Sequence, residues 1–262
     1  MELKNKKVLI TGGSTGIGRA IVKELIQYGV KEIAVVGRKK QHLETLKAEF
    51  TTANILIIQA DVSVTEDLNK VVSTISREWG MLDILINNAG VVSAGLLAEQ
   101  SDEDIMGQVN INLTGLILLT KKSIGLLQKS NEGAIVNISS GYGYIAMPFY
   151  SVYAATKAAV AQFSNAMRRE LYQYPIHVMT VYPSATNTGM MKTAVVDKMD
   201  NPEDVAKATI DGLILKEINV IMGGTEREEQ VKLNFLEPEK FDQIAADSFE
   251  ALRKRTKNHR SM

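Results

Sequence analysis

The chain has 262 residues, of which 45% are hydrophobic, and this is enough to bury one large core in a single domain. Its 30 basic and 30 acidic residues give a formal net charge of zero, which argues against nucleic acid or an anionic membrane as the main partner. The absence of cysteine excludes disulfides and thiolate chemistry, and three scattered histidines without ligand spacing argue against a metal site.

Short β-branched and aliphatic runs alternate with helical patterns along the chain. The runs are apolar nearly throughout, as expected for strands that helices cover on both faces, so we predict an α/β fold with a doubly wound parallel sheet of about seven strands. Strands are expected at 6–11, 32–37, 54–61, 82–90, 133–140, 176–184 and 218–224, and helices at about 17–28, 41–50, 66–79, 105–127 and after Pro148.

Two further expectations concern the ends and the membrane. The N-terminal segment lacks an apolar core long enough for a signal peptide, and Lys121 and Lys122 interrupt the longest apolar region, 111–127. A membrane-spanning helix needs about 20 apolar residues, so we expect a buried helix there and a cytoplasmic protein. Residues 1–224 are predicted to form one domain that includes the active site, and residues 225–262 a polar, helical appendage.

The loop after the first strand carries Gly12, Gly16 and Gly18 with Gly-x-x-x-Gly-x-Gly spacing. Glycine lets the backbone turn tightly and approach a pyrophosphate, whose charge then faces a helix N-terminus. Glycines also end strands, but the position of these between a strand and a helix favours dinucleotide binding.

The end of the second strand indicates which dinucleotide is bound. An NAD-binding chain usually places a carboxylate there for the ribose 2′-hydroxyl, whereas this chain has Gly37, Arg38, Lys39 and Lys40. A guanidinium can pair with a 2′-phosphate in a forked geometry, so the sequence favours NADP(H) over NAD(H). The alternative is a solvated basic loop.

Two other strand ends carry candidate cofactor residues. Asp61 follows the third strand and can accept a hydrogen bond from the adenine amino group or cap the next helix. The small residues of the stretch 87–90, NNAG, would let a cofactor lie across the sheet edge where the strand order reverses.

Together these segments resemble the short-chain dehydrogenase/reductase family in its compact single-domain form. The matching stretches are TGGSTGIG (11–18), DV (61–62), NNAG (87–90), NLTG (112–115), NISS (137–140), YAATK (153–157) and YPSATNT (182–188). The resemblance covers about residues 5–223 and implies a Rossmann-type sheet, a nicotinamide cofactor and a homodimer or homotetramer.

The resemblance also implies roles for individual residues. Tyr153 would be the acid/base, Lys157 its partner, Ser140 the active-site serine and Asn112 the assisting asparagine. The implied cofactor contacts are Gly12, Ser14, Thr15, Gly16, Ile17, Gly18, Arg38, Asp61, Val62, Asn88, Ala89, Gly90, Tyr153, Lys157, Pro183, Thr186 and Thr188.

The chemistry explains why these residue types would be needed. Reducing a ketone requires a proton on the developing alkoxide, and free tyrosine, with a pKa near ~10, exchanges protons poorly at neutral pH. Lys157 lies four residues after Tyr153, so both share one helix face, and its ammonium is expected to lower the tyrosine pKa. Ser140 can donate a hydrogen bond to the substrate oxygen.

Several alternatives stay open at this point. Strand alternation puts Ser139 and Ser140 on opposite faces and does not choose between them, although family spacing favours Ser140. Asn112 either bonds to backbone or holds a water in a proton relay from Lys157. Thr188 either reaches the nicotinamide carboxamide or caps a helix.

Four tyrosines lie close together in the stretch 139–160. Tyr142 and Tyr144 follow Ser140 and are expected to line the pocket, whereas Tyr150 has Ala154 where an activating lysine would be needed. Only Tyr153 has a lysine one helical turn away, so it is the predicted acid/base.

The chain departs from the family pattern in two places. Ser184 replaces the usual glycine after Pro183, so that loop is expected to be less pliable. The stretch from Gly189 to the helix at about 201 is short, which suggests an open pocket or a lid completed by the C-terminal segment.

The leading prediction is an NADP(H)-dependent oxidoreductase that transfers a hydride between nicotinamide and a carbonyl or secondary alcohol. The alternatives are a non-catalytic NADP-binding sensor or scaffold, and an epimerase or dehydratase, for which the polar tail is too short to form a sugar-nucleotide domain. Aromatic and Met-rich stretches around 141–150 and 189–196 favour an apolar or bulky carbonyl substrate, although Met also fills irregular cores.

Overall fold

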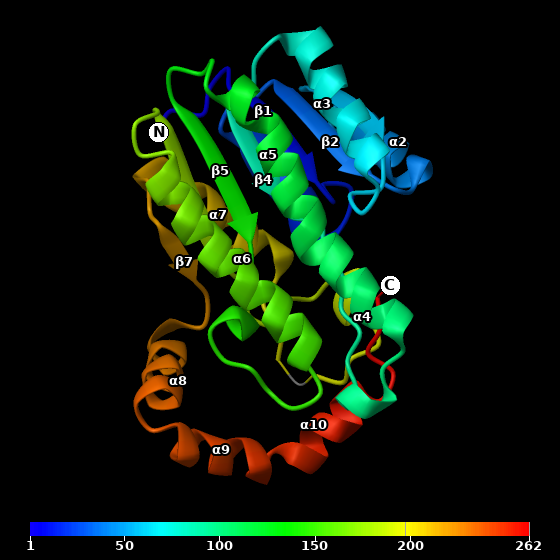
Figure 1. The fold of residues 1–262 in the computed structure, drawn as a ribbon. Helices are drawn as coiled ribbons and strands as arrows, with labels where there is room; N and C mark the ends of the chain where they lie inside the picture. The colour runs from blue at the N-terminus through cyan, green and yellow to red at the C-terminus, as the bar shows by residue number, and fades with distance from the viewer. Residues whose placement is uncertain (197, 262) are drawn as a thin grey trace.

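The computed structural model describes residues 1–196 and 198–261. Seven strands form one sheet in the order β3-β2-β1-β4-β5-β6-β7, and every neighbouring pair is parallel (Figure 1). The strands are β1 (Lys7–Thr11), β2 (Glu32–Gly37), β3 (Asn54–Gln59), β4 (Ile84–Asn87), β5 (Gly133–Ile138), β6 (Ile176–Tyr182) and β7 (Asn219–Ile221). The predicted doubly wound parallel sheet is confirmed, and its order reverses between β1 and β4.

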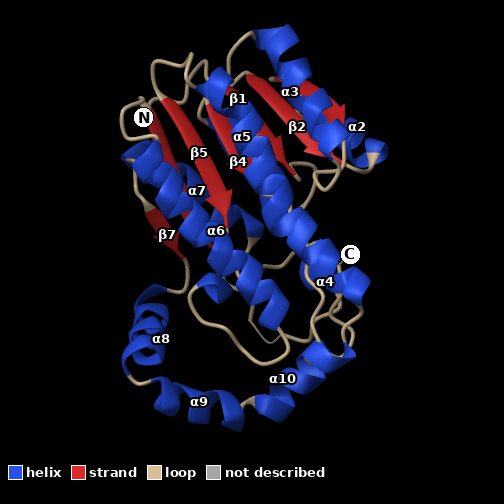
Figure 2. Ribbon diagram, in the orientation of Figure 1, coloured by secondary structure: helices blue, strands red, loops and turns tan. Residues whose placement is uncertain are grey.

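Helices cover both faces of the sheet (Figure 2). One face packs against α1 (Gly16–Gln27), α2 (Lys40–Glu49) and α7 (Pro202–Leu215), and the other against α3 (Thr65–Trp79), α5 (Gly115–Leu127) and α6 (Ser151–Glu170). In β1, Val8 and Ile10 point into the first core and Leu9 into the second. This alternation buries both sides of each strand, which is why the runs are apolar throughout.

The helix predicted over 105–127 contains a local irregularity. It consists of α4 (Asp102–Val109), a π-helical segment (Asn110–Thr114) and α5 in direct succession. A π segment adds a residue to one turn, so it rotates the side chains on either side of it relative to each other. The segment buries Asn112 against the end of β4.

Two glycines of α5 give a matched test of packing. A Cβ on Gly115 would collide with the carbonyl of Val62, whereas a Cβ on Gly125 would meet nothing within 4 Å. We expect Gly115→Ala to lower the free energy of unfolding by about 2–3 kcal/mol, because backbone atoms must shift. Gly125→Ala should raise it by about 0.5–1 kcal/mol through helix propensity. Urea denaturation measures both, and equal effects would contradict the close contact between Gly115 and the Val62 carbonyl.

The C-terminal segment runs across the carboxyl end of the sheet. After β7 the chain forms α8 (Gly224–Leu236), α9 (Pro238–Asp247) and α10 (Phe249–Thr256), which curve below the sheet and bring the C-terminus beside α4 (Figure 1). Leu252 packs in a small apolar cluster with Val92, Phe149, Tyr150 and Tyr153. The segment predicted as an appendage therefore contacts the part of the domain that carries the candidate site.

Candidate active site

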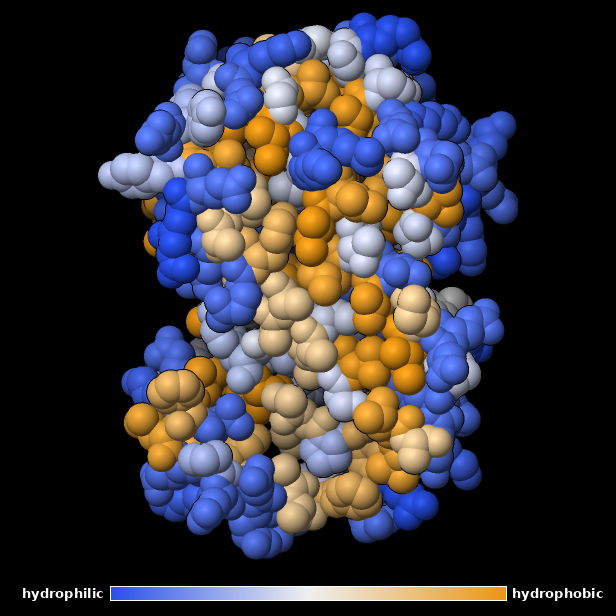
Figure 3. Space-filling model, viewed as in Figure 1, coloured by the Kyte–Doolittle hydropathy of each residue, from blue (hydrophilic) through white to orange (hydrophobic). Residues whose placement is uncertain are grey.

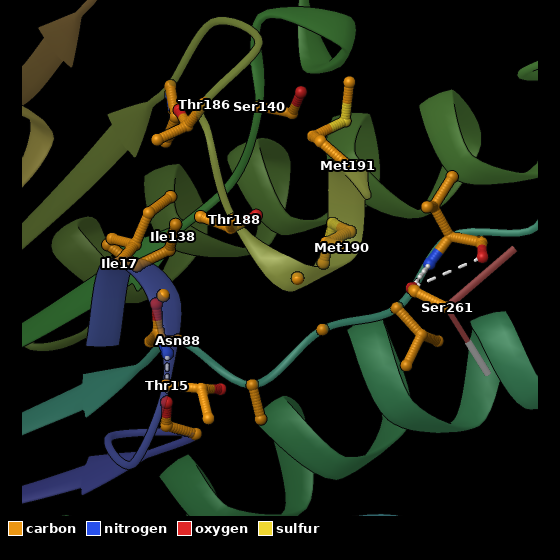
Figure 4. Close-up of a pocket in the computed structure, with 18 of the residues that line it drawn as sticks. Thr15, Ile17, Asn88, Ile138, Ser140, Thr186, Thr188, Met190, Met191 and Ser261 are labelled. Carbon is orange, nitrogen blue, oxygen red and sulfur yellow. Dashed lines mark hydrogen bonds between the residues drawn. The ribbon is translucent and has the colours of Figure 1, made fainter. Parts of the chain in front are cut away.

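A cavity of about 620 Å³ opens at the carboxyl ends of the strands. Figure 4 shows Thr15, Ile17 and Asn88 at one end and Met190 and Ser261 towards the other. All predicted cofactor residues except Gly18 line it, as does Ser140, whereas Asn112 lies outside the lining. Ligands of open parallel sheets bind at this edge, where the strand order reverses.

The turn between β1 and α1 fits a pyrophosphate. Gly16 has a φ of +53°, which is unfavourable for side chains with a Cβ, and a Cβ on Gly18 would collide with the carbonyl of Gly12. Gly18 does not line the cavity; it is needed because the chain packs closely behind the turn. Thr15 is the N-cap residue of α1, but its hydroxyl accepts no hydrogen bond from the first N–H groups of that helix. These N–H groups are therefore available to an anion bound in the cavity, which Thr15 and Gly16 line.

The end of β2 places a basic side chain at the cavity rim. Arg38 is half exposed, and its Nη1 lies 4.0 Å from Asp61 Oδ2. Asp61 Oδ1 accepts hydrogen bonds from the N–H and hydroxyl of Ser63, at 2.9 and 2.6 Å. Asp61 therefore organises the turn before α3, while Val64 occupies the N-cap position of that helix. The carboxylate also lines the cavity.

The two serines after β5 have different surroundings. Ser139 is buried and its hydroxyl donates to the Lys157 carbonyl at 2.8 Å. Ser140 lines the cavity, and its Oγ accepts from the Tyr142 N–H at 3.2 Å. Strand alternation left this choice open; Ser139 also lines the cavity, but its hydroxyl is bonded to the backbone, so the geometry favours Ser140.

Tyr153 and Lys157 share one face of α6 and both line the cavity, although neither is more than slightly exposed. The Lys157 Nζ lies 5.7 Å from the centre of the Tyr153 ring and donates to the Ile138 carbonyl at 3.0 Å. Burial lowers the pKa of Lys157 to about 8, because the ammonium loses hydration.

The expected lowering of the Tyr153 pKa is wrong for the chain without cofactor. Burial raises that pKa to about 12, and the Ser140 hydroxyl beside the phenol opposes this only in part. The physical reason is that desolvation of the phenolate outweighs its stabilisation, since Lys157 directs its ammonium to the Ile138 carbonyl.

Asn112 makes three hydrogen bonds within the protein. Its Oδ1 accepts from the Val91 N–H at 2.8 Å, and its Nδ2 donates to the Val91 carbonyl at 2.9 Å and to Thr156 Oγ1 at 3.2 Å. Backbone bonding is thus the role that the contacts support. A Cβ on Gly90 would lie 3.3 Å from Asn112 Oδ1 and 3.4 Å from Lys157 Nζ, so the amide and the ammonium flank the same glycine. The water relay stays a prediction.

The loop after β6 is held by a serine where the family has glycine. The Ser184 hydroxyl donates to the Asp200 carboxylate, and the Thr186 hydroxyl donates to the Ser184 carbonyl at 2.9 Å. These bonds tie the loop to the start of α7. Thr188 precedes a short 3₁₀ turn (Gly189–Met191) without capping it, and its Cγ2 would lie 3.1 Å from a Cβ on Gly16. Its side chain therefore faces the glycine turn across the cavity.

The structure separates the clustered tyrosines. Tyr142 lines the cavity as predicted, and so does Tyr150. The prediction for Tyr144 is wrong: within the described residues it is absent from the lining, and its ring stacks on Tyr182 with centroids 4.2 Å apart. Two residues after Tyr142, the chain has turned away from the cavity towards β6.

Four of the lining residues that sequence reasoning missed come from the C-terminal segment. They are Arg227, Arg255, His259 and Ser261. The charged run 253–260 gives no local signal of this, because solvated tails have the same composition. Of the two arrangements considered from the sequence, an open pocket and a lid completed by the C-terminal segment, the position of these four residues supports the second.

His259 fastens this segment to the cavity wall. Its Nε2 lies 3.1 Å from the Met190 carbonyl, which can only accept, so Nε2 carries the proton and Nδ1 accepts from the Tyr150 hydroxyl at 2.9 Å. Burial lowers the pKa of His259, which keeps the ring neutral in this arrangement. The tail is thus attached through a tyrosine and a methionine that both line the site.

The fold and the cavity, with a glycine turn at the switch point of the strand order and a Tyr-Lys pair on α6, are typical of nucleotide-binding α/β proteins. The family model described as short chain dehydrogenase matches residues 6–199. The chain therefore belongs to the short-chain dehydrogenase/reductase family, as the sequence resemblance predicted.

Individual relatives agree with this assignment. The chain is 36% identical over 201 residues to 11-beta-hydroxysteroid dehydrogenase-like 3 of Arabidopsis thaliana, and the alignment covers 75% of this chain but only 64% of that protein. It is 36% identical over 188 residues to an uncharacterized short-chain type dehydrogenase/reductase of Sinorhizobium fredii, with 71% and 72% covered. A solved short-chain dehydrogenase from Sphingobium yanoikuyae in complex with NADPH has a TM-score of 0.80 at 29% identity, covering 90% of this chain and 95% of that chain.

Among residues 1–196 and 198–261, no cluster of three or more His, Asp or Glu side chains has a geometry that could hold a metal ion. None of the helices in the same residues combines the length and the hydropathy needed to cross a membrane.

Proposed function

We propose that the protein is an NADP(H)-dependent oxidoreductase that interconverts a carbonyl compound and a secondary alcohol. The observation that carries the proposal is the convergence of Ser140, Tyr153 and Lys157 at one part of a cavity whose other end is the glycine turn. Family membership supports a dehydrogenase or reductase that uses a nicotinamide cofactor and acts on a small molecule.

In the reduction, the bound cofactor supplies the hydride for the carbonyl carbon. Tyr153 gives its phenol proton to the oxygen, so that one hydride on carbon and one proton on oxygen convert the ketone to the alcohol. Ser140 donates a hydrogen bond to the same oxygen as negative charge develops there. Lys157 stabilises the phenolate that remains, and proton return from solvent restores the phenol.

The choice of NADP(H) rests on Arg38. Its guanidinium at the end of β2 is half exposed at the cavity rim, where a carboxylate would stand in an NAD-binding chain. The solved relative from Sphingobium yanoikuyae contains NADPH, which supports the same choice.

Removing this guanidinium should weaken NADPH selectively. We expect Arg38→Ser to raise the KM for NADPH by about 10–100-fold, because a charge-assisted bond to the 2′-phosphate is lost. The KM for NADH should change by less than about 3-fold. Lys40→Ser is the control, since Lys40 pairs with Glu44 on α2. Parallel losses with NADPH and NADH in Arg38→Ser would contradict the role of Arg38.

A single assay tests the function as a whole. NADPH oxidation, with NADH as control, is measured over a panel of neutral and charged ketones and aldehydes. Turnover of at least one compound is the expected result. Tight NADPH binding without turnover of any compound would favour the non-catalytic sensor instead.

Assembly into a homodimer or homotetramer and a cytoplasmic location stay predictions. Hydrophobic residues extend along the front of the molecule over α5 and α6 (Figure 3). Partly buried apolar side chains of these helices include Leu118, Ile124 and Phe163, and a face of this kind suits contact with a second copy.

A further inference from the structure

The cavity lining contains two separate pairs of basic residues. Arg38 and Lys39 lie at the end of β2, where a 2′-phosphate would be bound. Arg227 and Arg255 also line the cavity, but they come from α8 and α10 of the C-terminal segment. In the described part of the chain, Asp61 is the single carboxylate of the lining, and it stands beside Arg38.

The second pair of arginines lies near the candidate reaction centre. The Arg227 Cζ would be 3.5 Å from a Cβ on Gly141, the residue directly after Ser140. Arg255 is close to Tyr142 and Tyr150. Burial raises the pKa of both tyrosines, and the positive charge of Arg255 opposes this effect. Both tyrosine rings lie within 6.4 Å of the Tyr153 ring.

The 2′-phosphate of a bound cofactor would lie far from this pair. The ends of β2 and β5 are separated by β1 and β4, which amounts to three strand spacings, or roughly 14 Å. A 2′-phosphate at Arg38 therefore leaves Arg227 and Arg255 without an anion from that end of the cofactor. The pair lies instead beside Gly141 and Tyr150, on the side of the cavity that carries Ser140 and Tyr153.

Neither guanidinium is neutralised by the protein. Among residues 1–196 and 198–261, no carboxylate oxygen lies within 4.0 Å of Arg227 or Arg255. The Nε of Arg255 is buried and has no hydrogen-bond partner within these residues. Burying such a donor without a partner costs free energy, which a bound anion would offset.

The segment that carries Arg255 is fixed to the domain. The Ala94 N–H donates to the His259 carbonyl at 3.0 Å, and the Ser261 N–H donates to the Val92 carbonyl at 2.9 Å. Arg260 pairs with Asp104, and Figure 4 shows Ser261 bonded at the cavity wall. These anchors hold α10 against the site, so its arginine is positioned before a ligand arrives.

We propose that the substrate carries an anionic group, a carboxylate or a phosphate, which Arg227 and Arg255 bind while its carbonyl meets Ser140 and Tyr153. Forked guanidinium groups pair with the oxygens of either anion. This inference rests on the proposed reductase function. It replaces the apolar or bulky carbonyl substrate that the sequence favoured with a carbonyl compound that carries a negative charge.

The test compares charged substrates with neutral partners. Oxo-carboxylic acids of increasing chain length are each paired with their methyl ester, and phosphorylated hydroxyketones with the free hydroxyketone. We expect the wild type to prefer one charged series by about 10–100-fold in kcat/KM. The preferred series distinguishes carboxylate from phosphate.

Variants connect this preference to the two arginines. Arg255→Met and Arg227→Met should each remove most of the preference for the charged compound, and Arg255→Lys should restore part of it. Lys254→Met and Lys232→Met remove a charge from exposed positions of the same two helices and should leave the preference unchanged. A preference that survives both arginine substitutions would overturn the proposal.

A binding measurement separates this inference from the proposed function. With NADPH present, a carboxylic acid or a phosphate monoester that lacks a ketone or aldehyde group should raise the Tm of the wild type but not of Arg255→Met. Equal turnover of charged and neutral partners would overturn the inference and leave the reductase function intact. Absence of turnover with a retained, arginine-dependent Tm shift would overturn the reductase function and leave the anion site intact. Absence of both turnover and the Tm shift would overturn the inference.

Discussion

Tyr153→Phe is expected to lower kcat by about 10²–10⁴-fold, the usual contribution of a positioned general acid. The dissociation constant of NADPH should change by less than about 3-fold, because only the hydroxyl is removed. The ring itself stays packed, edge-on to Tyr142 at 6.2 Å and to Tyr150 at 6.4 Å, so the wall of the cavity is retained.

The raised pKa of Tyr153 in the free chain makes this effect specific. A phenol with a pKa of about 12 is fully protonated at neutral pH, so the proton donor is present before the reaction begins. The phenolate that forms in reduction then depends on neighbouring positive charge, from Lys157 and from the oxidised nicotinamide. Phenylalanine can neither donate the proton nor hold this charge.

Tyr144→Phe is the matched control for this substitution. It removes the same hydroxyl from the same stretch of chain, but its ring stacks on Tyr182, away from the cavity. Steady-state kinetics of both variants and NADPH titration by fluorescence give the comparison. A kcat of Tyr153→Phe within about 10-fold of wild type would remove Tyr153 from the mechanism.

The parts of the site that the sequence predicts are those encoded by neighbours along the chain. Gly12, Gly16 and Gly18 lie within one turn, and Tyr153 and Lys157 lie one helical turn apart, so local geometry is sufficient to predict their arrangement. The same holds for the strands, whose apolar runs indicate burial on both faces. These features are visible in the structure as predicted from the pattern.

The parts that the sequence does not predict depend on distant contacts. Arg255 and His259 reach the cavity from about 100 residues beyond Tyr153, and a charged run near the C-terminus has the composition of a solvated tail. The raised pKa of Tyr153 follows from its burial, to which the electrostatic effect of Tyr142 adds, and residue spacing encodes neither. Tyr144 turns away from the site because it finds a partner in β6, which is remote in sequence.

Lys157→Met is expected to make the cofactor-free protein more stable at pH 7. The pKa of Lys157 falls from 10.5 to about 8 on folding, because burial removes water from its ammonium. A shift of this size costs the folded state about 3 kcal/mol at neutral pH. Methionine avoids this cost but loses the bond to the Ile138 carbonyl, worth about 0.5–1.5 kcal/mol, so a net gain of about 2 kcal/mol is expected.

The sign of the pH dependence makes the prediction specific. Between pH 8 and 10.5 the unfolded chain binds more protons at Lys157 than the folded chain does, so wild-type stability rises with pH in this window. Below about pH 8 the full penalty is present. The advantage of the methionine variant should therefore be largest at pH 7 and disappear by about pH 10.5, where the lost hydrogen bond leaves the variant slightly less stable.

Urea denaturation of the wild type and the variant at pH 7, 9 and 10.5 measures the difference directly, and contributions from other titrating groups cancel in the subtraction. Lys121→Met is the control, because Lys121 is exposed on α5 and water hydrates its ammonium in both states. A difference for Lys157→Met that stays constant with pH would show that its ammonium is not desolvated by folding. Since the same substitution removes the positive charge next to Tyr153, a more stable but inactive variant would mean that the fold retains this buried lysine for catalysis at the expense of stability.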